Sequence, residues 1–135
     1  MNQLEFIDAV ADRANVTTDR AEVLARATLE TLADRLSGGE AEDLAAELPG
    51  LQDRLRRPVD KPAERFGLQE FVRRTAERAG VDAGQAKEGV RAVLTTVREA
   101  VSGSGFRDVM AQLPKEFREV IESTSWRGGE PPRRG

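Results

Sequence analysis

The side chains that most often perform acid–base or nucleophilic chemistry at neutral pH are missing from this sequence. Its 135 residues include no histidine, no cysteine and no tyrosine. Carboxylates, hydroxyls, arginines and three lysines remain. A carboxylate needs a shifted pKa to act as a general acid or base, and most acidic residues here fall on the polar faces of helices. We therefore expect a protein that is not an enzyme and has no catalytic residues.

A metal site in this chain would have to use oxygen ligands only, since there is no histidine or cysteine. The densest group of acids, Glu40, Glu42, Asp43 and Glu47, lies within one short predicted helix. Acids at the start of a helix also stabilise its dipole, and we favour that structural role. The glycine-rich stretches lack the preceding strand and following lysine of a phosphate loop. We expect no metal and no cofactor.

Two groups of side chains could bind a partner. A basic strip in the second half comprises Arg73, Arg74, Arg78, Lys87 and Arg91, but acids interleave with it and no aromatic residue accompanies it for base stacking. The single tryptophan, Trp126, is followed by Arg127. Trp126 could anchor a protein partner or fold back onto the end of the protein. The candidate interaction residues are Trp126, Arg73, Arg74 and Arg127.

An internal repeat must position these side chains. With an offset of 65 residues, the segment 6–56 matches the segment 71–121 without a gap. The match includes turn residues as well as apolar ones: Ser37-Gly38 aligns with Ser102-Gly103, and Leu48-Pro49 with Leu113-Pro114. An ungapped match of this kind indicates two copies of one structural unit.

Each copy predicts four amphipathic helices. In the first copy Asn2 and Glu5 have the spacing of a capping box, and Asn15 tolerates the left-handed geometry that ends a helix. Ser37 and Glu40 repeat the capping spacing before the third helix. The fourth helix is short, around residues 51–55 and 117–121. No alternating β-branched run is bounded by a hairpin turn, so we expect an all-α fold of about eight helices.

We divide the chain into repeat one (1–56), a proline-containing linker (57–65), repeat two (66–124) and a disordered tail (125–135). A unit of roughly 60 residues buries little surface by itself, so the two repeats are expected to form one domain. The linker is too short for separate motion. We therefore predict two four-helix repeats packed face to face around a pseudo-twofold axis.

Charged residues shared by both copies favour structural roles. We predict one ion pair within each repeat, Arg26 with Asp43 and Arg91 with Asp108, in which the arginine stem covers the core. An arginine pair that binds a ligand is the alternative. Arginines close the first helix of each copy and are expected to bond its last carbonyls; these are Arg13 and Arg78.

Net charge and hydropathy limit the partners further. The chain has a net charge of −3, with 12 acidic and 6 basic side chains in residues 1–56 and 12 acidic and 15 basic ones in residues 57–135. The isoelectric point of about 5.2 disfavours a nucleic-acid partner. No signal peptide and no membrane-spanning apolar run occur. We expect a soluble cytoplasmic protein with no membrane partner.

The motif Gly39-Glu40-Ala41-Glu42-Asp43-Leu44-Ala45-Ala46-Glu47-Leu48-Pro49 follows a long helix ending Leu32-Ala33-Asp34-Arg35-Leu36. This arrangement, with an opening helix from Phe6 to Val10, resembles the bacterial domain-of-unknown-function family numbered 2267. The resemblance covers about 120 residues and implies a tandem helical fold in a bacterial cytoplasmic protein, with no activity to carry over. In the second copy Ser104-Gly105-Phe106 replaces Gly-Glu-Ala, so the acid is lost.

The sequence therefore favours a non-catalytic helical protein that acts through protein–protein contacts, either with another protein or by self-association. The alternative is weak nucleic-acid binding through the basic face of repeat two. If the chain has a site, we expect it where the two copies differ.

Overall fold

The computed structural model describes residues 1–48, 50–55 and 62–121. Their helices are α1 (Gln3–Ala14), α2 (Thr18–Arg35), α3 (Gly38–Ala46), the 3₁₀ helix η1 (Gln52–Leu55), α4 (Leu68–Ala79), α5 (Ala83–Ala100) and α6 (Gly103–Ala111). Residues 116–121 are also helical, and no strand occurs within the described ranges. The predicted all-α fold is confirmed. None of these helices is both long and apolar enough to cross a membrane.

Local sequence signals begin and end these helices, and those predicted at Asn2, Glu5 and Asn15 are confirmed. The Asn2 side chain accepts from the Glu5 N–H at 2.8 Å, and the Glu5 carboxylate accepts from the Asn2 N–H at 3.0 Å. Asn15 ends α1 with a φ of 58°, and Gly80 ends α4 with a φ of 68°. Asp82 caps α5 by accepting from the Gln85 N–H at 2.8 Å. These contacts span a few residues each, which is why sequence alone predicts them.

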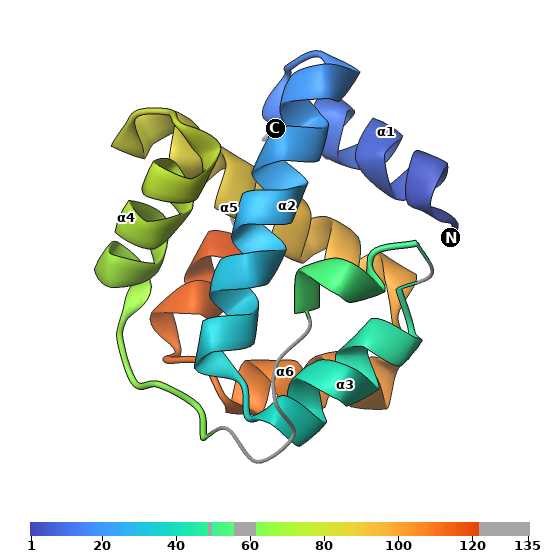
Figure 1. The fold of residues 1–135 in the computed structure, drawn as a ribbon, viewed down its shortest axis with the longest axis vertical. Helices are drawn as coiled ribbons and strands as arrows, with labels where there is room; N and C mark the ends of the chain where they lie inside the picture. The colour runs from blue at the N-terminus through green and yellow to red at the C-terminus, as the bar shows by residue number, and fades with distance from the viewer. Residues whose placement is uncertain (49, 56–61, 122–135) are drawn as a thin grey trace, which may run out of the picture.

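The two 18-residue helices α2 and α5 cross at the centre of the molecule (Figure 1). Helix α1 packs on α2 and α5, while α4 packs on α5 and α2. Figure 1 shows α1 and α4 on opposite sides of this crossing, with α3 and α6 together at one end. The core is continuous from α1 to the last helical residues, and its largest fully buried side chains include Phe6, Phe71 and Phe117.

The helices α2 and α5 are in close contact at Gly89. A Cβ on Gly89 would lie 2.8 Å from Cδ2 of Leu24 and 3.2 Å from its Cβ. Leu24 is 2% exposed, and its position is 65 residues before Gly89. The Leu24 side chain on α2 therefore occupies the space that a side chain at Gly89 on α5 would need. This fit sets how close the two central helices can come.

Arg35 holds the end of the predicted linker against the bundle. Its side chain is 5% exposed, and its guanidinium donates to the carbonyl oxygens of Glu64 at 2.6 Å and Gln112 at 2.5 Å. The Glu64 N–H in turn donates to the Asp34 carbonyl at 2.9 Å. Glu64 is thus bonded to α2, whereas linker residues 57–61 and the predicted tail, 125–135, lie outside the described ranges.

Candidate functional site

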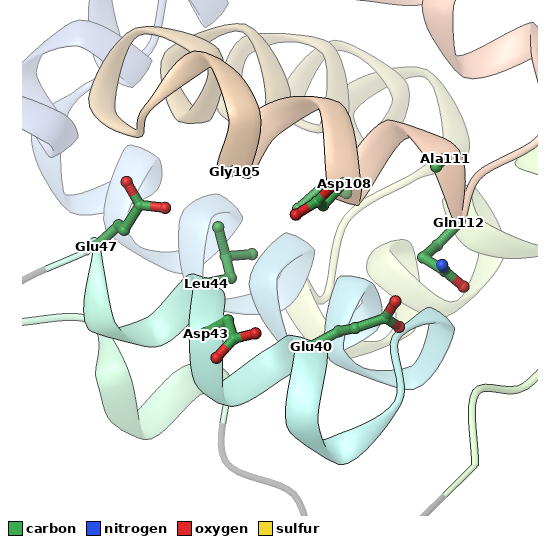
Figure 2. Close-up of a pocket in the computed structure, with 9 residues that line it drawn as sticks. Glu40, Asp43, Leu44, Glu47, Gly105, Asp108, Ala111 and Gln112 are labelled. Carbon is green, nitrogen blue, oxygen red and sulfur yellow. The ribbon is translucent and has the colours of Figure 1, made fainter.

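A cleft of about 300 Å³ separates α3 from α6 (Figure 2). Four carboxylates line it: two from α3, one from the residue that ends α3 and one from α6. Figure 2 shows Glu47 directed toward the Gly105 end of α6 and Asp108 facing α3 across the cleft. The carboxylates are Glu40, Asp43, Glu47 and Asp108.

Two of these carboxylates already have structural partners. Glu40 completes the predicted capping box of α3, since its carboxylate accepts from the Ser37 N–H at 3.1 Å. Glu47 caps α6 instead, because its carboxylate accepts from the Ser102 N–H at 2.8 Å. A Cβ on Gly105 would overlap the Glu47 carboxylate. The acid that the second copy lacks at position 105 is therefore replaced, as a cap, by Glu47 of the first copy.

Replacing Glu47 by alanine is expected to lower the free energy of unfolding by about 1 kcal/mol, because the α6 N-terminus loses a cap. Adding Gly105→Glu to Glu47→Ala should recover most of this loss, since a glutamate at position 105 has the capping-box spacing from Ser102. Urea unfolding measures both effects. Glu42→Ala, which removes an exposed acid of α3, is the control. Equal stabilities of Glu47→Ala and Glu42→Ala would contradict the capping role.

The remaining acids of the cleft, Asp43 and Asp108, are exposed. No ion pair joins Arg26 to Asp43 or Arg91 to Asp108 among the described residues, so the structure does not form the predicted pairs. Arg91 contacts Glu88 at 3.3 Å, one turn earlier in its own helix, and Arg26 points to solvent. Across the described part of the chain, no group of three or more potential metal ligands gathers in metal-binding geometry.

The prediction for Arg13 and Arg78 is wrong, because both reach across to the other half of the chain. Arg13 donates to the Thr96 hydroxyl at 2.8 Å and pairs with Glu99. Arg78 donates to the Thr31 hydroxyl at 2.9 Å and pairs with Asp34 at 3.0 Å. In the last turns of α1 and α4, the carbonyls of Ala11 and Ala76 instead accept from backbone N–H groups of the residues that follow each helix: Asn15, Val16, Gly80 and Val81.

A groove of about 780 Å³ lies between α4 and α5. Its floor is apolar, with Leu68, Val72 and Ala76 at successive turns of α4. On the α5 side the small residues Ala83 and Gly84 leave the groove open. Charged and polar residues form its rim: Gln69, Glu70, Arg73, Lys87 and Glu116. An apolar floor with a polar rim is typical of a surface that binds another polypeptide.

The two candidate arginines of α4 are held by carboxylates. Arg73 bonds Glu70 at 2.6 Å and Glu77 at 2.8 Å. Arg74 bonds Asp34 and Glu64, each at 3.1 Å, and lies 3.9 Å above the ring centroid of Phe66. Hydrogen bonds from Arg73 and then Arg74 lower the pKa of Glu70 to about 2, so this carboxylate stays ionised at neutral pH.

Lys87 differs from these arginines, since it has no carboxylate partner within the described ranges. The groove brings Arg73 and Lys87 together. Arg74 lies outside its lining, and Trp126 and Arg127 lie outside the described residues.

Sequence reasoning missed the groove because the stripe Leu68, Val72 and Ala76 has the same periodicity as a core stripe. A signal was present in the comparison of the two copies. Thr18-Asp19 of the first copy aligns with Ala83-Gly84 of the second, so side-chain volume is lost where the groove opens.

A family model described as "Uncharacterized conserved protein (DUF2267)" matches residues 3–120 of the chain. The matched region contains all the described helices from α1 to α6. No curated protein matches the chain.

Proposed function

We propose that this chain, which belongs to the DUF2267 family of uncharacterized conserved proteins, is a non-catalytic helical protein that acts through protein–protein contacts at its α4–α5 groove. The proposal includes a bacterial source and a cytoplasmic location, supported by the resemblance and by the absence of cysteine.

The groove is the observation that carries this proposal. Its apolar floor can bury the apolar face of a partner helix, while Lys87 at the rim, which no carboxylate engages among the described residues, can contact an acidic side chain beside that face. Its volume of about 780 Å³ exceeds the 300 Å³ of the α3–α6 cleft, where Glu40 and Glu47 already serve as caps. The groove therefore offers the larger apolar surface of the two.

Nucleic-acid binding by the basic strip has weaker support. Arg73, Arg74, Arg78 and Arg91 each pair with a carboxylate, and only Lys87 of the strip has no such partner in the described part of the chain. A phosphate would have to displace these carboxylates, which would offset much of the electrostatic gain.

We also propose that the two repeats pack around a pseudo-twofold axis, which gives each binding surface a counterpart on the other repeat. The support is reciprocal contact at positions 65 apart: Arg13 bonds Thr96 as Arg78 bonds Thr31. The helices are related in the same way, since the first helix of each repeat packs on the long helix of the other: α1 on α5, and α4 on α2. This packing leaves the outer faces of α1 and α4 directed away from each other (Figure 1).

The test compares proteins retained from a nuclease-treated lysate by the immobilised chain and two variants. Ala83→Trp fills the groove from an exposed position, and Thr18→Trp places the same side chain at the matching exposed position of α2. We expect quantitative mass spectrometry to show at least one protein retained by wild type and Thr18→Trp but reduced at least about tenfold by Ala83→Trp. Identical retention by all three forms would refute binding at the groove. Retention that occurs in a parallel untreated lysate and is lost after nuclease treatment would favour the nucleic-acid alternative.

A further inference from the structure

The outer face of α1 combines exposed apolar and acidic side chains. Leu4 is 70% exposed and Met1 is 47% exposed, and they are the only large apolar side chains exposed among the described residues. Asp8 and Asp12 follow Leu4 at one and two helical turns, so they share its face. Both are exposed, and no hydrogen bond or ion pair engages either of them within the described ranges. This acidic, apolar stripe has no partner among the residues that the structure describes.

The α4–α5 groove has the complementary character. Its floor is apolar and its rim carries Arg73 and Lys87. The complementarity extends to matched positions, because Asp8 aligns with Arg73 and Glu22 with Lys87 at the offset of 65. Charge is thus opposite at these matched positions. Because Arg73 is already paired with Glu70 and Glu77, Lys87 is the rim cation without a described carboxylate partner, and it is the charge that favours contact with the acidic face of α1.

We propose that the α1 face of one chain docks in the α4–α5 groove of a second copy, with Leu4 over the apolar floor and Asp8 beside Lys87. This inference rests on the proposed function of the groove and names its partner. A chain cannot fill its own groove with α1, because α1 is packed on α2 and α5, across the molecule from α4 (Figure 1). Since the two contacting faces are different, the association is head-to-tail and can continue beyond a dimer.

One helix face in one groove buries less surface than a standard stable interface, so the association is expected to be weak. Its acidic and basic contacts lie at exposed rims, so added salt should weaken it further. Sedimentation velocity of the purified full chain at low salt should therefore show a sedimentation coefficient that rises with concentration and falls on adding about 0.5 M salt.

Two charge reversals provide a sharper test. Asp8→Lys reverses a charge on the α1 face and leaves the groove unchanged. Lys87→Asp reverses a charge at the groove and leaves α1 unchanged. Each variant alone should lose self-association by at least about tenfold. Mixed together, they should regain self-association, because the intact face of one variant meets the intact groove of the other, and the two reversed surfaces carry opposite charges and attract each other as well. Asp43→Lys, at an exposed acid on α3, is the control and should associate like wild type.

The outcomes separate this inference from the proposed function. A purified chain that remains monomeric at every concentration would overturn self-association, as would a mixture of the two variants that forms no dimer. In either case, retention of another protein that is lost in Ala83→Trp would leave the groove as a binding site for a different partner. If the chain neither self-associates nor retains a protein that Ala83→Trp loses, the proposal that the groove binds proteins is wrong.

Discussion

Replacing Gly89 by leucine is expected to lower the free energy of unfolding by about 3 kcal/mol or more, because the central helices would have to move apart. The position lies inside α5, where glycine costs about 1 kcal/mol relative to alanine. Any side chain there meets Leu24, whose Cβ and Cγ would both lie 3.2 Å from the new Cβ. Chemical unfolding followed by circular dichroism measures the loss.

A second variant separates this steric clash from a general effect of substitution. The double variant Leu24→Gly with Gly89→Leu swaps the leucine and the glycine between α2 and α5. It removes the clash, so it should recover part of the stability that Gly89→Leu loses. Gly84→Ala is the matched control, because Gly84 is an exposed glycine of the same helix whose nearest new contact would be 3.4 Å away. It should gain up to about 1 kcal/mol from helix propensity. A Gly89→Leu protein as stable as wild type would contradict the close approach.

Replacing Arg35 by methionine is expected to cost about 3 kcal/mol. Methionine retains an apolar stem but cannot donate, so the carbonyl oxygens of Glu64 and Gln112 lose charged hydrogen bonds worth about 1.5–3 kcal/mol each. Desolvation opposes this stabilisation, since burial and then the nearby Arg65 lower the pKa of Arg35. The hydrogen bonds outweigh this cost, because methionine would leave two backbone acceptors without their donor.

Arg26→Met is the matched control for Arg35→Met. Arg26 is an exposed arginine of the same helix, so its replacement should change stability by less than about 0.5 kcal/mol. Amide hydrogen exchange offers a second readout, because Arg35→Met should speed exchange of the Glu64 N–H, which bonds the Asp34 carbonyl. Equal unfolding curves for the two variants would show that Arg35 does not hold the linker end.

The sequence comparison of the two copies predicted some contacts correctly and others wrongly, and the difference is physical. Capping residues such as Asn2, Ser37 and Asp82 act within one helical turn, so their roles follow from spacing. Arg13 and Arg78 were assigned to nearby carbonyls by the same local reasoning, yet their long side chains reach the opposite half of the chain. A flexible arginine finds its partner in three dimensions, and spacing does not reveal that partner.

The loss of the acid at position 105 illustrates the same limit. We expected a function where the copies differ, but Gly105 makes room for the Glu47 carboxylate, which then caps α6. That difference between the copies is structural compensation. Other differences, from Asp8 to Arg73 and from Glu22 to Lys87, are on exposed faces and support the proposed docking.

By itself, then, the sequence of this DUF2267 protein determined its helical class, its helix ends and its apolar stripes, because these depend on residues a few positions apart. Only the tertiary structure decided that Leu24 meets Gly89, that Arg35 holds the linker end, and that α4 and α5 leave a groove between them. These features join residues up to 77 positions apart, as Arg35 and Gln112 do. They depend on how whole helices pack, which no local pattern specifies.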